Sequence, residues 1–512
     1  MKKSLLHSII VFAVSVMFLS CAEFSHISKV SEEEETIRLQ ERHAAKMIRE
    51  DSEMLFKAFQ TARTIEIPYN KADAYESIAG VYKADGQYDK AVIVAKSIAD
   101  AKMRAFAVSR ISEQAYKDGR HDKAIEILSQ ATDIAKTIDD KHMKAYTLAI
   151  IGGKYTEFGK KDTAAEVLSQ AYGIADTIDD DGIKSYDFTI IGEKLANAGE
   201  KDRSGEILSE AYEIAEAIDD EYNRITAMDM IANVLASDQQ YDEANVIIQK
   251  ILNVFTKDAG PDRIAQLYAQ IGQYDNAVEM AKTINNPYSK TFALVRVSEE
   301  VLENDDKAIE IVSQAHEIAK GIDDEFIRSA AMVKVASGYL GLQQYGKAHE
   351  IATTIENTPN RYAALERIAE AYAKDKQYNQ ALQITETVED PYYRASTIIR
   401  IANEYTRDGQ KDKAGELLSK AYEIAETIRD SHAKSLVQSN IADGYAEAGQ
   451  YDKAAQAAAI IEDTYYKDTG FYRISFWYFE SEQYDQALKV SESIEDAYYK
   501  SSIFTWIAGK ES

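Results

Sequence analysis

The chain has 512 residues, with 59 Lys and Arg against 86 Asp and Glu, a formal net charge of −27 and a single cysteine. This charge excludes nucleic acid and an anionic bilayer surface as the main partners, because both would repel it. One cysteine excludes an intramolecular disulfide and a cysteine-based zinc or iron–sulfur site. The 45% hydrophobic content predicts a folded core, and only five prolines indicate long uninterrupted helices.

The first twenty residues have the pattern of a signal peptide. Lys2 and Lys3 precede an apolar stretch, residues 5–19, that is short for a membrane span. The stretch ends in Phe18-Leu19-Ser20-Cys21, which resembles the lipobox of bacterial lipoproteins, although leucine stands two rather than three residues before the cysteine. The alternative is ordinary cleavage at Ser20-Cys21-Ala22, which would release a soluble protein. The position of the lone cysteine favours the lipoprotein.

The resemblance to lipoproteins implies that residues 1–20 are removed and that Cys21 carries the acyl chains, palmitate among them, that hold the protein on a lipid bilayer. Ala22 after the cysteine resembles the sorting pattern for the outer membrane, which implies the periplasmic face of a bacterial cell envelope. Residues 21–50 are predicted to form the lipidated tether and an N-terminal capping helix, opened by the capping box Ser31-Glu32-Glu33-Glu34.

Residues 51–512 repeat one short motif, Gly-Gln-Tyr-Asp-Lys-Ala, in exact or relaxed form. Its last residue, which we call the anchor, recurs every 31 to 40 residues, at Ala91, Ala124, Ala164, Ser204, Ala244, Ala277, Ala308, Ala348, Ala381, Ala414, Ala454 and Ala487. A period of this length predicts stacked units that bury their apolar faces against their neighbours.

Each unit is predicted to contain two helices. A small residue stands twelve residues before most anchors, Ile or Val precedes it, and Tyr usually follows three residues later, as at Ile78, Ala79 and Tyr82. These offsets place the residues on one helical stripe, and the small residue lets two helices approach closely. In five units seven more residues follow the anchor, close to two helical turns, so the second helix is expected to be longer there.

This pattern resembles the tetratricopeptide repeat (TPR) family. The closing proline of that family is mostly replaced by an acidic pair, such as Asp139-Asp140, whose second member can cap the next helix. The resemblance implies an all-α, right-handed superhelical solenoid of about twelve TPR-like hairpins with terminal capping helices.

A first column of basic residues lies four residues after these helix-starting aspartates, as in Asp140 and Lys144. We expect each pair to interact within its own helix and to have a structural role.

Enzymatic constellations are nearly absent from the sequence. The eight histidines show no HxxH spacing, so we expect no metal. Gly341 to Ala348 imitates a phosphate loop, but Ala348 stands where a hydroxyl would bind magnesium and is also an anchor. The acidic pairs recur from unit to unit, which favours capping over a catalytic dyad. We therefore expect a protein that is not an enzyme and binds no cofactor.

A second basic column stands just before the Ile or Val of the first helix and is expected to face solvent. Its members in five successive units are Arg263, Arg296, Lys334, Arg367 and Arg400, with Arg110 and Arg473 elsewhere. In three earlier units the same position holds Ile150, Ile190 and Met230. The first helices of TPR proteins line a concave groove, and some members hold a partner's carboxylates at this place. The alternative is that these cations are solvated or paired within their helices, as Arg296 with Glu299.

The sequence therefore favours a membrane-anchored TPR scaffold or adaptor lipoprotein without catalysis. Its groove is expected to bind a protein segment that is acidic or apolar, with Arg263, Arg296, Lys334, Arg367 and Arg400 as the partner-binding residues. A lipoprotein of the envelope that binds a glycan or a small substrate is the alternative. Tyrosine pairs at Tyr392-Tyr393, Tyr465-Tyr466 and Tyr498-Tyr499 could stack on sugars, but their position between units favours packing.

Overall fold

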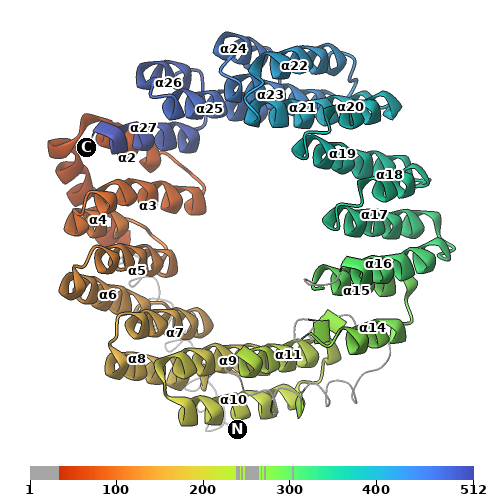
Figure 1. The fold of residues 1–512 in the computed structure, drawn as a ribbon. Coiled ribbons are helices and arrows are strands. Elements are labelled where there is room, and N and C mark those ends of the chain that lie inside the picture. Colours follow the sequence, from red (N-terminus) through yellow and green to blue (C-terminus); the bar gives the residue numbers. More distant parts are fainter. Residues whose placement is uncertain are drawn as a thin grey trace, which may run out of the picture. The chain divides into compact units, whose positions relative to one another are not determined.

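The computed structural model describes residues 34–511, apart from 238–242, 244, 245, 248–264, 267, 270, 271 and 302–304 (Figure 1). The signal peptide, Cys21, Ser31 and Arg263 lie outside the described residues. The chain divides into two compact units, of which unit 1 contains residues up to Glu210 and Asp496–Ser512, and unit 2 contains Ala211–Glu495. Residues 51–512, expected to form one solenoid, therefore contribute to two units, and the first boundary falls within a helix.

The described residues of unit 1 form helices and no strands. A helix over residues 34–51 precedes α2, and Ser52 between them accepts a capping hydrogen bond from the backbone N–H of Leu55. The helices are α2 (Glu53–Arg63), α3 (Pro68–Ala84), α4 (Tyr88–Ala95), α5 (Ala101–Lys117), α6 (His121–Lys136), α7 (Lys141–Glu157), α8 (Lys161–Ala175), α9 (Asp181–Ala198), the first part of α10 (Lys201–Ala217), and α27 (Ala497–Glu511).

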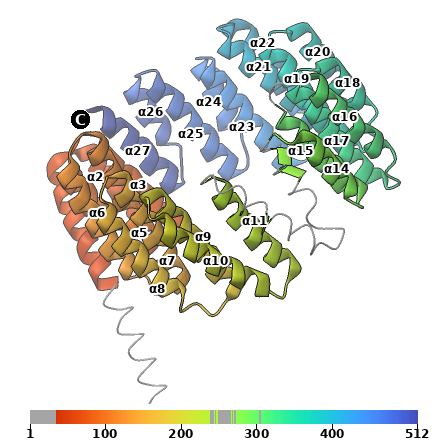
Figure 2. The same cartoon turned by 60° about the horizontal axis from the view of Figure 1, so that its bottom comes forward.

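Unit 2 continues the same alternation of helices in its described part. Its helices are α11 (Glu221–Ser237), α14 (Tyr274–Thr283), α15 (Pro287–Glu299), α16 (Asp305–Lys320), α17 (Glu325–Gly341), α18 (Tyr345–Thr353), α19 (Thr358–Lys374), α20 (Tyr378–Thr387), α21 (Pro391–Arg407), α22 (Lys411–Ala425), α23 (Ser431–Glu447), α24 (Tyr451–Ala459), α25 (Thr464–Glu480) and α26 (Tyr484–Ser491). The two views in Figures 1 and 2 show the helices paired as antiparallel hairpins within each unit.

The predicted hairpins are confirmed, and the repeat motif forms their core. All eleven anchors in the described residues have no exposed surface, and the small residues of the first helices are buried beside them. The approach is close: a Cβ built on Gly152 would lie only 2.7 Å from Cγ of Leu168 on the following helix. The predicted lengthening is also confirmed, because α6 has 16 residues where α4 has eight.

The turn inside each hairpin explains the glycine of the motif. Seven such glycines have φ between 72° and 91°, a conformation that residues with a Cβ rarely adopt. Where the motif lacks glycine, Gln343, Lys376 and Glu482 take the same left-handed conformation, with φ between 55° and 59°. The segment that imitates a phosphate loop, Gly341 to Ala348, spans one of these turns.

The acidic residues at the helix starts act as caps, as predicted. Asp140 accepts a hydrogen bond from the backbone N–H of Met143 at 2.7 Å, and Asp324 accepts one from Ile327 at 2.8 Å. The same arrangement occurs at Asp100, Asp180, Asp220, Asp390, Asp430, Asp463 and Asp496. These side chains satisfy N–H groups that a helix leaves unpaired in its first turn.

The prediction that each base of the first basic column pairs with the aspartate four residues earlier in its own helix was wrong. No ion pair between an Asp cap and the base four residues later occurs among the described residues. Instead the Arg104 guanidinium donates to the carbonyl oxygens of Ile98 and Ala99 at 2.6 and 2.7 Å, and Arg328 donates to those of Ile322 and Asp323. These carbonyls lie just beyond the C-terminal end of the preceding second helix, where a positive charge also interacts favourably with the helix dipole. The column is structural, but it connects one hairpin to the next.

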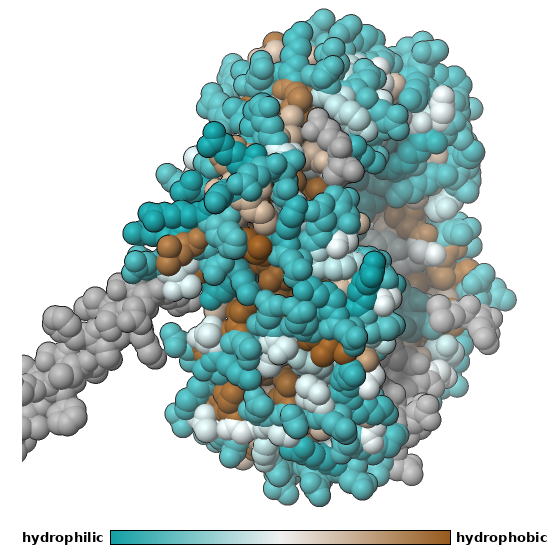
Figure 3. All heavy atoms as spheres, turned by 90° about the vertical axis from the view of Figure 1, so that its left-hand side faces the viewer, coloured by the Kyte–Doolittle hydropathy of each residue, from teal (hydrophilic) through white to brown (hydrophobic). Residues whose placement is uncertain are grey.

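The face of the molecule drawn in Figure 3 is mostly hydrophilic, with hydrophobic residues in scattered patches between hydrophilic ones. Within the described ranges, none of the helices combines the length and apolar character that crossing a membrane requires.

Candidate functional site

The second basic column occupies one defined position, the tenth residue of successive first helices. Arg296, Lys334, Arg367 and Arg400 hold this place in α15, α17, α19 and α21. The next two residues, such as Ile368 and Ala369, are buried in the hairpin. The tenth residue is therefore turned toward the surface that the first helices share, which we call the first-helix face.

Several of these cations form ion pairs with the preceding first helix rather than within their own. Arg400 donates from Nε to Glu366 at 2.5 Å and from a terminal nitrogen to Glu370 at 2.8 Å. Arg110 contacts Glu76 through two nitrogens, and Arg473 contacts Asp443. The acids are the ninth or thirteenth residues of the preceding first helix. At these places the column joins neighbouring repeats.

The ion pairs change the ionisation of the groups that form them. Partial burial lowers the pKa of Arg400, but the hydrogen bonds and charges of Glu366 and Glu370 outweigh it, so the pKa is raised. Burial raises the pKa of Glu370, but Lys374 and Arg400 outweigh it and the net shift is downward. The Arg400 charge is therefore largely neutralised by the protein itself.

Arg367 differs, because the preceding helix offers it no acid. The ninth and thirteenth residues of α17 are Val333 and Ser337, where α19 has Glu366 and Glu370. The side chain of Arg367 is exposed and forms no ion pair with any described residue.

The positive charges of Lys334 and Arg296 are only weakly neutralised by the groups around them. Lys334 lies 4.5 Å from the ring centroid of Phe292 and has no ion pair in the described part of the chain. Arg296 lies 6.0 Å from the same ring and donates to the neutral amide of Gln266. Burial raises the pKa of Glu299, while the nearby charges of Lys334 and Arg296 lower it, and the net shift is upward. We call Arg296, Lys334 and Arg367 the basic patch.

The first-helix face of unit 1 has a different character. The sixth residues of α5, α7 and α9 are Phe106, Tyr146 and Tyr186. Their rings follow one another, with centroids 6.5 Å apart between the first two and 6.3 Å between the last two. Ile150 and Ile190 stand one helical turn later on α7 and α9, and all five side chains are partly exposed. We call these five residues the apolar strip.

Sequence analysis identified the isoleucines of the apolar strip but missed its rings. The signal was present, because an aromatic residue occupies the sixth position in three successive first helices. It was hidden because the repeat motif was aligned on buried positions, and the sixth residue lies outside that stripe.

A buried acid–base pair lies beside the apolar strip. His142 Nδ1 is 2.9 Å from Oδ1 and 3.0 Å from Oδ2 of Asp187, and the His142 ring meets Tyr186 edge-on at 5.9 Å. Asp187 is only 1% exposed. Burial raises the pKa of its carboxyl to about 6, although the hydrogen bond and charge of His142 lower it. This pair joins residues 45 positions apart, and nothing in the sequence pattern indicated it.

Unit 1 also contains an open cleft between α3 and α5. Its volume is about 770 Å³, and Tyr69, Glu76, Lys102, Phe106 and Arg110 lie on its walls. Tyr69 is 68% exposed, and Phe106 continues this surface into the apolar strip. The cleft therefore extends the part of the first-helix face that could receive side chains of a partner.

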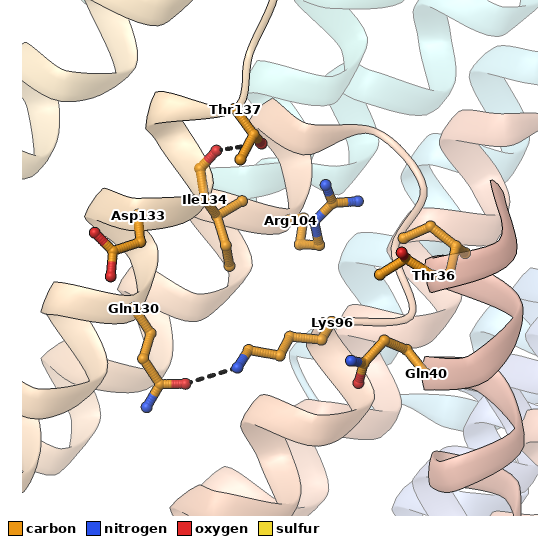
Figure 4. A pocket seen from close by; sticks show the side chains of 9 residues that line it. Thr36, Gln40, Lys96, Arg104, Gln130, Asp133, Ile134 and Thr137 are labelled. Carbon is orange, nitrogen blue, oxygen red and sulfur yellow. Dashed lines mark hydrogen bonds between the residues drawn. The ribbon is translucent and has the colours of Figure 1, made fainter. Parts of the chain in front are cut away.

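A smaller pocket of about 370 Å³ lies near the ends of the second helices (Figure 4). Lys96 reaches across it to donate to Gln130 at 2.8 Å, and Thr137 donates to the carbonyl of Ile134. Arg104 lines it and is bonded to backbone carbonyls. These polar groups stabilise the junction between hairpins. Among the described residues no cluster of three His, Cys, Asp or Glu is arranged to bind a metal.

The tyrosine pairs contact neighbouring repeats, as the packing interpretation predicts. Tyr393 lies 5.6 Å from the ring of Tyr362, and Tyr466 lies 5.0 Å from that of His432. Tyr465, in contrast, is 64% exposed. In this pair Tyr466 packs against the neighbouring repeat while Tyr465 faces solvent, whereas both members of the other two pairs are half-buried.

Comparison with known proteins gave structural similarities only. No family model matches the chain, and no curated protein matches it. Ton1535 from Thermococcus onnurineus NA1 is 19% identical over 63% of this chain and 97% of that chain, with a TM-score of 0.28. A putative kinesin light chain of Podosopora anserina with nearly identical TPR-like repeats is 22% identical over 39% and 99%, with a TM-score of 0.24. A Rap protein complexed with competence and sporulation factor is 12% identical over 72% and 99%, with a TM-score of 0.25.

The assignment of the repeats rests on their motif and on the observed hairpins, in which the anchor, the small residue and the glycine turn each have the place that the motif predicts. The chain is thus built of TPR-like helical hairpins.

Proposed function

We propose that this protein is a non-catalytic scaffold that binds a segment of a partner protein on the first-helix face of its repeats. Carboxylates of the partner would bind the basic patch, and apolar side chains of a partner would pack on the apolar strip. The sequence places Arg263, which lies outside the described residues, in the same column. Arg400 would add contact area beside Arg367 although its own charge is paired.

The observation that carries this proposal is the contrast between cations at one repeat position. Arg110, Arg400 and Arg473 contact carboxylates of the preceding first helix, whereas the equivalent positions of the helix before Arg367 hold Val333 and Ser337. A cation that stabilises the contact between repeats needs an acid at that place. Arg367 has none, so its charge is available to a carboxylate from another molecule, which a guanidinium can bind through two hydrogen bonds.

The test is cross-linked capture of partners with the intact protein as bait. A triple variant, Arg296→Glu with Lys334→Glu and Arg367→Glu, would be run beside it. The matched control is Arg473→Glu, which changes the same repeat position at a place where the cation is already paired. We expect a partner that the native bait and the control recover and that the triple variant loses. Equal recovery by all three baits would remove the basic patch from the function.

We further propose that the scaffold is lipid-anchored through Cys21 at the periplasmic face of a bacterial outer membrane. The support is the signal-like stretch that ends at the lone cysteine. Labelled palmitate should enter the native chain and not Cys21→Ala, and the variant should leave the membrane fraction. Equal membrane association without label would contradict the anchor.

A further inference from the structure

The C-terminal helix α27 has the residue pattern of a first helix. Ile507 and Ala508 are its eleventh and twelfth residues, as Ile78 and Ala79 are in α3. Both Ile507 and Ala508 are buried, at 1% and 2% exposure. Within unit 1, α27 packs against α2, which lies near the other end of the sequence (Figures 1 and 2).

The contact of α27 with α3 reproduces the register between successive first helices. A Cβ on Gly509, the thirteenth residue of α27, would lie 3.5 Å from Cγ2 of Val81, the fourteenth residue of α3. A Cβ on Gly153, the thirteenth residue of α7, would likewise meet Lys194, the fourteenth residue of α9. The helix α27 therefore stands before α3 as α7 stands before α9.

Hydrogen bonds to α3 and to α2 hold α27 in this register. The Tyr498 hydroxyl donates to Asp73 on α3 at 2.8 Å. The Ser501 hydroxyl donates to the carbonyl oxygen of Ala58 on α2 at 3.0 Å, across 443 residues of sequence. Ser501 and Ala58 are both fully buried, so this bond forms within a packed interface rather than at its edge. A buried hydroxyl without such a partner would be costly.

The interface around these bonds is apolar. Ile503 and Ile507 of α27 and Phe59 and Ala62 of α2 are buried, and Phe59 stacks on Tyr75 of α3 at 5.0 Å between ring centroids. Removal of α27 would expose this surface to water, which is unfavourable in proportion to the apolar area. Unit 1 therefore depends on a helix that reaches it only after the whole of unit 2 has been passed in sequence.

We propose that α27 is a C-terminal clasp, that is, a helix that forms a hairpin with α2 of the same molecule and packs against α3. In the clasp, α27 is the first helix and α2 the second helix of one hairpin, so this repeat is made from two distant segments. The hairpin that begins with α3 thereby gains a first-helix neighbour, α27, in place of one from the adjacent sequence. Because the entropy cost of closing a loop grows only slowly with its length, the long separation does not prevent the clasp from closing. This inference is independent of partner binding.

An engineered disulfide tests the clasp in the full chain. In a Cys21→Ala background, Val81→Cys and Gly509→Cys would be combined, and each single variant would serve as a control that can only form disulfides between molecules. We expect near-complete loss of free thiol in the double variant, with migration as a monomer on a non-reducing gel and a cross-linked peptide containing both positions. A dimer would show exchange of α27 between copies and overturn the proposal, and so would thiols that stay free.

A second pair of variants separates the clasp from a general effect on folding. Ser501→Arg places a charge in the contact with α2, whereas Ser502→Arg places it on the next, partly exposed residue. We expect amide exchange in α2 to accelerate at least tenfold in Ser501→Arg while it stays close to native in Ser502→Arg. Equal protection of α2 in both variants would overturn the clasp.

Discussion

The first-helix faces of the two units share one framework and differ in what they present on it. The tenth residue is Ile150 in α7 and Ile190 in α9 of unit 1, and it is Lys334 in α17 and Arg367 in α19 of unit 2, while the eleventh and twelfth residues of these helices are buried. The difference teaches that the repeat fixes where a side chain points and leaves its chemistry free. Within the described residues, the apolar strip and the basic patch lie on the same face of the first helices, each in its own unit, and carry side chains of different chemistry.

The largest expected effect is on partner binding, when the cations at the tenth position in unit 2 are replaced by the isoleucine that holds this position in α7 and α9 of unit 1. Lys334→Ile with Arg367→Ile should weaken partner binding about 100-fold, because each charge-assisted hydrogen bond contributes about 1.5 kcal/mol or more. The free energy of unfolding should change by less than about 0.5 kcal/mol, since neither cation has an ion pair in the described chain. Titration calorimetry with the captured partner and urea unfolding would measure both. Unchanged affinity would mean that the two surfaces do not differ in function.

The buried carboxyl of Asp187, beside the apolar strip, should make the stability of unit 1 depend on pH. The equivalent positions of unit 2 should give no such dependence. The pKa of Asp187 is raised from 3.8 to about 6, so the folded state binds more protons than the unfolded state between these values. Stability from this group is therefore present at low pH and is lost as pH rises through 6, by roughly 2–3 kcal/mol in total. The seventh residues of α15, α17 and α19 are Ala293, Ala331 and Ala364.

Asp187→Asn tests this difference by urea unfolding at pH 4.5 and pH 7. The variant should lose the part of the pH dependence that this carboxyl supplies, and the native protein should become less stable relative to it at pH 7. A control variant, Asp179→Asn, changes a carboxyl for which no such partner occurs among the described residues. The same pH dependence in native protein and Asp187→Asn would contradict the assignment.

The contact between helices in a hairpin also differs between the units. Gly152 and Gly192 hold the twelfth position of α7 and α9 in unit 1, whereas Ala336 and Ala369 hold it in α17 and α19 of unit 2. Gly152→Ala should destabilise unit 1 by about 2 kcal/mol, because the new Cβ would lie 2.7 Å from Leu168. Gly173→Ala is the matched control, since a Cβ there meets nothing within 4 Å. Denaturant unfolding of the two variants should give changes of opposite sign, because alanine favours a helix by up to about 1 kcal/mol.

The smallest effect concerns the turn within the hairpin. The turns that follow α3, α5, α7 and α9 in unit 1 all have glycine with a positive φ, whereas Gln343, Lys376 and Glu482 stand at three of the equivalent turns in unit 2. Gln343→Gly should stabilise unit 2 by about 1 kcal/mol, because glycine adopts this conformation without a steric penalty. The reverse change, Gly409→Gln, should destabilise it by a similar amount in the same unfolding experiment. A loss of stability in Gln343→Gly would show that its side chain has a role that outweighs the backbone conformation.

Sequence reasoning reached the hairpin and its local contacts. The buried anchors, the small residue of each first helix, the Asp caps and the longer second helices all depend on residues within one or two helical turns. Their spacing in the sequence is therefore their spacing in the structure. The same reasoning located the tenth position as the exposed one and found the change from Ile150 to Lys334 along the chain.

Only the tertiary structure decided which groups meet between helices. The partners of Arg400, the pairing of His142 with Asp187 and the contact of Ser501 with Ala58 depend on the register of one helix against another. A repeat motif specifies that helices stack, but many surface residues can meet once they do. The sequence by itself thus determined the repeating hairpin, because its causes are local. Packing decided which charges are neutralised and which remain on the surface, because those partners lie 30 or more residues away or on a distant segment of the chain.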